Sequence, residues 1–194
     1  MKRIMHQISA KKLSIVVLAL AAAFSAFGAG DVGKVKCVGR PGDAGVFIDG
    51  KYVGPASRFT VPESYEAPAG TVEVTLKDPR YEDFTSKVTV RAKKKTKIHY
   101  AMKKLPEPKG PFGLFRLKGG EPESFISVAA GDISPIYIND KFYGHVDELN
   151  NLGSGILLQP GTYDLRISSP IFGEINQKLV IEANKTTYVP ISKK

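Results

Sequence analysis

Apolar and polar residues alternate along several short stretches of the chain, as in half-buried β-strands. Between residues 71 and 76, Val72, Val74 and Leu76 alternate with polar side chains. The same alternation occurs at 88–90 and 98–100, on either side of a polar turn. No segment after residue 30 keeps a helical period over three turns. The pattern therefore predicts an all-β fold.

The alternating stretches belong to an internal repeat. The sequence VFIDGKYVG at 46–54 recurs as IYINDKFYG at 136–144, an offset of 90. The sequence PAGTVEVTL at 68–76 recurs as QPGTYDLRI at 159–167, an offset of 91, and matches at this offset continue as far as Ile191. One register kept over three blocks predicts two tandem copies of one structural unit.

Turn residues separate the predicted strands at regular intervals. Asp49-Gly50 between apolar runs favours a type I′ hairpin, whose two central residues both have positive φ, and Asn139-Asp140 can serve the same turn. Ala69-Gly70 and Pro160-Gly161 indicate turns that lead into the next strand. Many short strands with regular turns predict two tandem small antiparallel β-sandwich modules, of the immunoglobulin or prealbumin type.

The N-terminus predicts export. Four basic residues precede an apolar stretch at 13–27, and Ala26-Phe27-Gly28 gives a small-x-small cleavage site. This is the arrangement of a secretory signal peptide, expected at residues 1–29. The apolar stretch is shorter than the roughly 20 residues that a membrane-spanning helix needs, and an uncleaved signal anchor is the alternative.

The remaining chain divides at a proline-rich segment. Residues 105–111 contain three prolines, which favour an extended, semi-rigid linker. We call residues 30–104 module one and residues 112–194 module two. Module two begins with an additional apolar stretch at 112–117, followed by Gly119-Gly120, which is interpreted as an extra edge strand.

Module one resembles the PEGA domain. The resemblance rests on the following features in chain order: the strand at 35–37, the turn PGDA at 41–44, the strand VFIDG at 46–50, Gly54, the turn at 68–70, the strand at 72–74, and Tyr81. Module two resembles the family less, with AGDI at 130–133 and Asn139-Asp140 at the corresponding turns, and is interpreted as a degenerate copy. Neither module has the family's glycine before the corner aromatic, since Arg80 and Ile171 stand there. The resemblance implies a small β-sandwich of exported or envelope proteins, with no catalytic residues.

The net charge and the single cysteine limit the kinds of partner that are expected. The formal net charge is +9, and removal of a leader with four cations and no carboxylate leaves +5. This mildly basic balance suits anionic envelope polymers and gives no reason to expect nucleic acid. Cys37 lies in an alternating stretch and is expected to be a small buried side chain; an intermolecular disulfide is the alternative.

Candidate chemistry is sparse. No two of the three histidines have metal-ligand spacing, and Gly153-Ser154-Gly155 lacks the sequence of a nucleophile elbow. We therefore expect neither catalysis, cofactor nor metal. A hydrolase stays the remote alternative, and it would need a pocket that joins His145 to Asp147 or Glu148.

Two groups of residues are candidates for ligand binding. Lys93, Lys94 and Lys95 lie in the densest basic run, which either binds anionic polymers or protects a strand edge from pairing. Tyr52, Phe142 and Tyr143 follow the hairpin turns, where they either stack on a sugar or pack across strands. Exposed aromatics would favour the sugar site, and buried ones would remove its basis.

The sequence thus predicts a non-catalytic, exported accessory or binding protein of the cell envelope. Its partner is expected to be an envelope polysaccharide or an envelope protein, with no transmembrane segment once the signal peptide is removed. A specific polysaccharide- or peptidoglycan-binding protein is the alternative.

Overall fold

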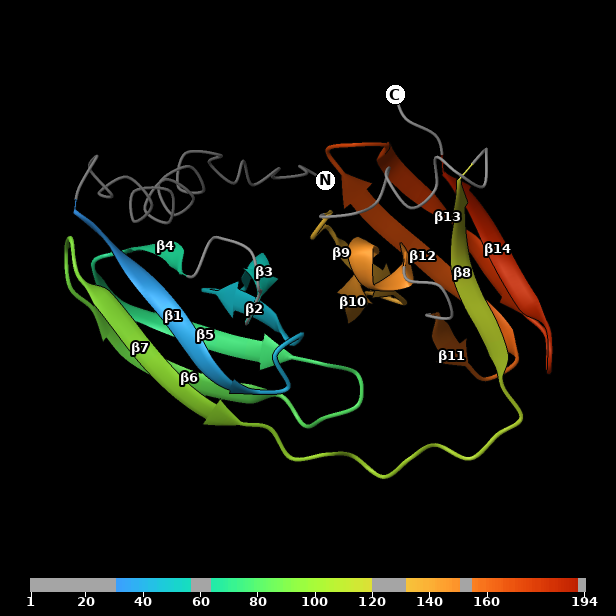
Figure 1. Ribbon diagram of the computed structural model, residues 1–194, viewed down its shortest axis with the longest axis horizontal. Coiled ribbons are helices and arrows are strands. Elements are labelled where there is room, and N and C mark those ends of the chain that lie inside the picture. Colours follow the sequence, from blue (N-terminus) through green and yellow to red (C-terminus); the bar gives the residue numbers. More distant parts are fainter. Residues whose placement is uncertain (1–30, 57–63, 120–131, 151–154, 192–194) are drawn as a thin grey trace, which may run out of the picture. The chain divides into compact units, whose positions relative to one another are not determined.

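The computed structural model describes residues 31–56, 64–119, 132–150 and 155–191, and confirms the all-β fold (Figure 1). The one helix among these residues is the short 3₁₀ helix η1 (Val146–Asn150). Residues 31–194 form one compact unit. The expected signal peptide, at residues 1–29, lies outside the described residues. Gly153 and Ser154, which were considered for a nucleophile elbow, also lie outside them. Within the described part of the chain, no helix is long and apolar enough to cross a bilayer.

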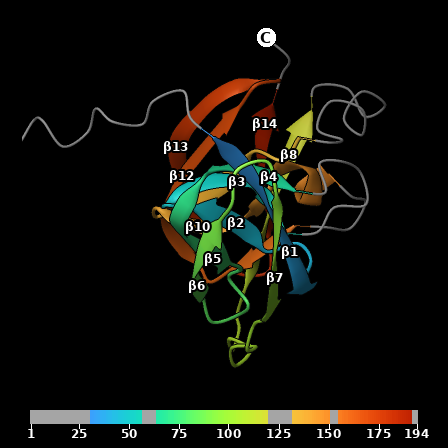
Figure 2. The same ribbon diagram turned by 90° about the vertical axis from the view of Figure 1, so that its left-hand side faces the viewer.

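Module one is a sandwich of two sheets. One sheet has the strand order β3-β2-β5-β6, and the other has the order β4-β1-β7. Figure 2 views these strands from the left of Figure 1, with β1 and β7 side by side. The strands are β1 (Val32–Arg40), β2 (Gly45–Ile48), β3 (Lys51–Pro55), β4 (Tyr65–Pro68), β5 (Gly70–Lys77), β6 (Phe84–Val90) and β7 (Lys95–Ala101).

Module two has the same architecture. Its sheets have the orders β10-β9-β12-β13 and β11-β8-β14, so each strand takes the place of the strand seven earlier in the chain. The strands are β8 (Gly113–Gly119), β9 (Pro135–Ile138), β10 (Lys141–His145), β11 (Ile156–Leu158), β12 (Gly161–Ser169), β13 (Gly173–Ile181) and β14 (Thr186–Ile191).

The expectation of an extra edge strand at the start of module two is wrong. That stretch forms β8, the central strand of its sheet, and is the counterpart of β1. A Cβ built on Gly33 would lie 2.3 Å from the carbonyl oxygen of Arg91, and one built on Gly113 would lie 2.3 Å from that of Glu182. Gly33 and Gly113 differ by 80 positions rather than 90. A longer connection between β8 and β9 therefore hid this part of the repeat.

One pairing in each module is parallel, so the sandwiches are not purely antiparallel. Strand β1 pairs with β7 in parallel, and β8 pairs with β14 in the same way. The first and last strands of a module are therefore neighbours. Sequence alternation cannot reveal such a pairing, because it reports only which face of each strand is buried.

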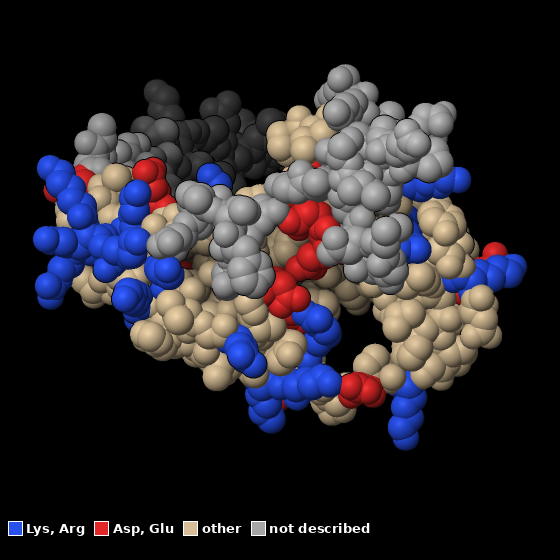
Figure 3. Space-filling view, in the orientation of Figure 1, with Lys and Arg blue, Asp and Glu red and all other residues tan. Residues whose placement is uncertain are grey.

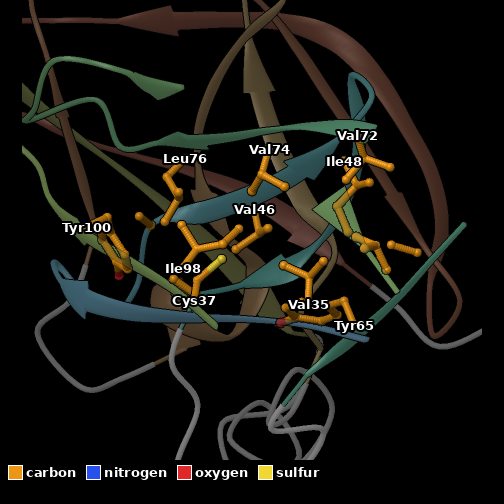
Figure 4. Packing of buried hydrophobic residues seen from close by; sticks show 14 of the residues in the cluster. Val35, Cys37, Val46, Ile48, Tyr65, Val72, Val74, Leu76, Ile98 and Tyr100 are labelled. Atoms are coloured by element: carbon orange, nitrogen blue, oxygen red, sulfur yellow. The ribbon is translucent and has the colours of Figure 1, made fainter. Parts of the chain in front are cut away.

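Each module has its own hydrophobic core. The first core lies within residues 35–102 and the second within residues 115–191. In module one, Val35 and Cys37 of β1 point toward Val74 and Leu76 of β5 (Figure 4). Cys37 is 3% exposed, as expected for a small buried side chain, and its burial raises the pKa of the thiol to about 11. This burial also keeps the thiol away from a second chain.

The predicted hairpin turns are confirmed. Asp49 and Gly50 both have positive φ, at 48° and 79°, and Asn139 and Asp140 follow at 49° and 59°. Each of the two turns also accepts a hydrogen bond from the strand that pairs with its hairpin in the sheet. Asp49 Oδ1 accepts from the Glu73 amide at 2.8 Å, and Asn139 Oδ1 accepts from the Asp164 amide at 2.8 Å. These carboxylate and amide oxygens therefore serve the turn.

Candidate functional site

The two modules meet through the same hairpin in each copy. Phe47 and Tyr52 of module one pack on Phe142 of module two, with ring centroids 5.6 Å and 5.7 Å apart. His145 completes this group, 5.3 Å from the Phe142 ring. We call these four residues the interface cluster. Tyr52 and Phe142 occupy equivalent positions of the repeat, so like surfaces contact each other.

Glycine at position 45 makes room for this contact. A Cβ at Gly45 would lie 2.6 Å from the tip of the Phe142 ring. In each hairpin a bulge follows the aromatic residue, at Val53 in β3 and at Tyr143 in β10. Bulges bend a strand and redirect its side chains. Here Phe142 lies in the contact with module one, while Tyr143 packs against the core of module two.

His145 is buried in this contact and hydrogen-bonded through both ring nitrogens. Its Nε2 lies 2.8 Å from the carbonyl oxygen of Asp43, which can only accept, so Nε2 carries a proton. Its Nδ1 lies 2.5 Å from the Tyr52 hydroxyl, which also lies 2.7 Å from the carbonyl oxygen of Ile133. Burial raises the pKa of Tyr52 above its ordinary range. A buried histidine that is hydrogen-bonded through both ring nitrogens thus joins the modules.

The structure covers the predicted aromatic residues in part or in full. Phe142 is 4% exposed, Tyr52 is half-buried against it, and Tyr143 is half-buried against module two. Stacking of a sugar on Tyr52 and Phe142 would need the two modules to separate. Of the two alternatives for these aromatic residues, the structure shows packing, which occurs between the modules because the two hairpins cover each other.

A cleft of about 850 Å³ lies beside the interface cluster. Acidic and basic side chains border it (Figure 3). Arg80 donates to Asp43 at 2.6 Å and to Asp78 at 2.6 Å, which ties the β1–β2 loop to the β5–β6 corner. These bonds raise the pKa of Arg80 further above its ordinary range. Arg80 stands where the family has glycine, and it thus adds a cation to the lining of the cleft.

Module two ties the same two segments together with different groups. Ser169 Oγ donates to Asp132 Oδ2 at 2.5 Å and accepts from the Ile171 amide at 3.0 Å. Both Ser169 and Asp132 are buried. The bond between loop and corner is therefore a shared feature of the two modules, and only module one builds it with an arginine.

Glu148 lines the cleft opposite Arg80 and Asp43. Partial burial and the negative charge of Asp43 raise the pKa of Glu148 to about 8. Its carboxyl also accepts from the His145 amide at 3.3 Å and lies 3.8 Å from His145 Nε2. His145 itself is 2% exposed and does not line the cleft. The pocket that a hydrolase would need therefore contains Glu148 without the histidine.

The raised pKa of Glu148 predicts a pH-dependent stability. The folded state keeps this proton up to about pH 8, whereas the unfolded chain loses it near pH 4.3. Between these values the folded state binds more protons, so its contribution to stability falls as pH rises. We expect Glu148→Gln to stabilise the protein at pH 8, relative to wild type, and to make no difference at pH 4. The gain is on the order of 1 kcal/mol, because solvent screens a side chain that is 37% exposed.

Thermal unfolding of both proteins at several pH values measures this difference. Glu182→Gln is the control, since its carboxyl is 60% exposed and lies at a distant turn. An equal gain for both variants at pH 8 would assign the effect to net charge instead of to the cleft.

Lys93, Lys94 and Lys95 are exposed at the β6–β7 turn and the start of β7. The positive φ of Lys93, at 56°, belongs to this turn. The structure does not bring these lysines near the aromatic candidates. Among the described residues, no three His, Cys, Asp or Glu side chains form a group that could hold a metal ion.

The fold and its features agree with a comparison to known families. The PEGA domain family matches residues 33–106. Module one is a PEGA domain. The match ends close to Leu105, whose amide donates to the carbonyl oxygen of Arg80 and closes the corner of this PEGA domain. PEGA domains are typical of exported proteins.

Other comparisons add little. No curated protein matches the sequence. A similar solved structure is the TIE protein of Bacillus anthracis, with 15% identity and a TM-score of 0.26. The similarity covers 84% of this chain and 34% of that protein, so the chain spans about a third of its length. At this TM-score the similarity supports no conclusion about fold or function.

Proposed function

We propose that the protein is a non-catalytic, exported binding protein of the cell envelope, built from a PEGA domain and a diverged second copy. The observation that carries this proposal is the interface cluster. Its tyrosine and histidine, the groups best suited to chemistry, are used to join the modules. The joined modules then offer their outer faces to an envelope polysaccharide or an envelope protein.

The equivalent features of the two modules support the interpretation of module two as a diverged second copy of the PEGA domain. Strand order, hairpin turns and the loop-to-corner bond all recur in module two. A contact between equivalent hairpins fixes one module against the other, and a fixed pair can bind a repeating polymer at two places. Simultaneous binding strengthens retention only if the geometry permits both contacts.

A pull-down tests this function. Residues 30–194 are incubated with purified envelope polysaccharides and with peptidoglycan, at low and at high salt. We expect retention on at least one envelope polymer at low salt. The absence of retention on every polymer at both salt concentrations would contradict an envelope-polymer function.

A saccharide site in the cleft is the second candidate function. Tyr143 and Tyr163 line the cleft together with Arg80 and Glu148, and carbohydrate sites combine aromatic faces with charged or amide groups. This candidate predicts retention that survives high salt and is lost in Tyr163→Ala. Tyr188→Ala is the control, because Tyr188 is 52% exposed on another sheet.

The same incubations address the hydrolase alternative. Glycoside hydrolysis needs a proton donor and a second carboxyl on opposite sides of the bond. Glu148 and Asp43 both line the cleft, but a 2.6 Å bond to Arg80 holds Asp43. We expect no soluble fragments from any polymer. Fragments that disappear in Glu148→Gln would overturn the non-catalytic proposal.

A further inference from the structure

The parallel pairing of β1 and β7 gathers lysines on the solvent face of the PEGA domain. Lys34 lies opposite Lys95, and Lys36 lies opposite Lys97. We call these four residues the basic row. The alternate residues of the same strands, including Val35, Cys37 and Ile98, are buried in the core. The lysines therefore project from the other face of the sheet.

The basic row extends at both ends. Arg91, Lys93 and Lys94 occupy the turn before β7, and Arg40 ends β1. Figure 3 shows basic side chains gathered where β1 begins and β7 starts, at the left of the view. Among the residues of β1, β4 and β7, Glu66 is the single acid. The sheet thus carries a strong local excess of positive charge.

Protection of a sheet edge does not explain this arrangement. Lysines on an edge strand discourage pairing with another chain, and β7 is an edge strand. However, β1 is the central strand of its sheet, so Lys34 and Lys36 guard no edge.

Module two lacks the paired lysines. Its corresponding pairs are Leu114 with Thr186, Arg116 with Tyr188, and Lys118 with Pro190. Its edge strand β14 has no lysine at all. The basic row is therefore a property of the PEGA domain alone, and the fold does not require it.

We propose that the basic row binds a linear phosphodiester polymer that runs along β1 and β7. Successive lysines on one strand are about 6.6 Å apart, and the two strands are about 4.8 Å apart, so the cations form a narrow track. Lysine is a compact point charge of the kind that binds phosphate. This inference rests on the proposed function and names the partner chemistry for one of its faces.

A flexible chain fits this surface better than a bilayer does. The right-handed twist of a sheet rotates a row of side chains along its length, which a flexible polymer can follow and a flat membrane cannot. Glu66 lies beside Lys34 on the same sheet face. A membrane over this face would bring Glu66 against anionic lipid, whereas a polymer along β1 and β7 leaves it at the side.

Binding of labelled poly(glycerol phosphate) to residues 30–194 tests the proposal. We expect the double variant Lys34→Gln/Lys36→Gln to bind about 10- to 100-fold more weakly at low salt. We expect the slope of log affinity against log salt to fall by about half, because two of four phosphate contacts are removed. The control Lys51→Gln/Lys87→Gln changes net charge equally at exposed positions of module one, and should bind like wild type.

The outcomes separate the inference from the function. Equal losses in both double variants, or an unchanged Lys34→Gln/Lys36→Gln protein, would overturn the basic row while the envelope function stands. Tighter binding to vesicles of anionic phospholipid, at equal phosphate concentration, would assign the face to a membrane and overturn the polymer. No retention of wild type on any envelope polymer would reject both. A second double variant, Lys95→Gln/Lys97→Gln, removes the other two lysines of the basic row. Unfolding midpoints of all variants check that a loss of binding is not a loss of fold.

Discussion

Replacing Leu76 with alanine is expected to lower the free energy of unfolding of the PEGA domain by about 2 to 5 kcal/mol. Leu76 is 0% exposed and lies on β5, between the two sheets (Figure 4). Truncation removes apolar surface from the core and leaves a cavity that a sandwich held by two sheets can close only in part. This cost is a large fraction of the stability of a small domain.

Guanidinium denaturation measures the loss, and hydrogen–deuterium exchange locates it. Because the modules have separate cores, exchange should rise most in β5, which carries Leu76, and in β2 and β6, which pair with it. Ile167→Ala is the matched variant in module two, at the equivalent position and also 0% exposed. Leu157→Ala should change stability by less than about 0.5 kcal/mol, since Leu157 is 63% exposed. Equal exchange in both modules of the Leu76→Ala protein would argue against separate cores.

The second large effect is expected from Phe142→Ala. Phe142 is 4% exposed, yet it belongs to neither hydrophobic core. Its ring packs on Phe47, Tyr52 and the backbone at Gly45. Removing it should cost about 3 kcal/mol, and this loss should fall on the contact between the modules.

The expected result is two separate unfolding transitions and a larger radius of gyration by X-ray scattering. Wild type should unfold with the modules coupled. The control is Tyr188→Ala, which truncates an aromatic residue outside the interface cluster. If Phe142→Ala leaves scattering and cooperativity unchanged, the interface cluster does not hold the modules together.

Local patterns were sufficient for much of the fold. The alternation at 71–76 and the hairpin residues Asp49-Gly50 and Asn139-Asp140 predicted strands and turns that the structure contains. The repeat predicted that one architecture occurs twice. These signals are local, since the face of a strand and the φ of a turn depend on a few neighbouring residues.

The aromatic candidates show where local reasoning ends. A hairpin aromatic such as Tyr52 or Phe142 is equally suited to a sugar, to a neighbouring strand and to a second module. Only the contact between the hairpins decided among these, and it also buried His145, whose sequence context gives no sign of burial.

By itself, the sequence determined that the protein is an all-β chain with a tandem repeat and a PEGA-like first module, and it predicted export. The tertiary structure decided which strands are neighbours and which surfaces stay exposed. Lys34 and Lys95 are 61 positions apart, and the parallel pairing of β1 and β7 places them side by side. Long-range pairing depends on how two sheets pack and on the length of the connections. Neither quantity is encoded in the alternation of a single strand.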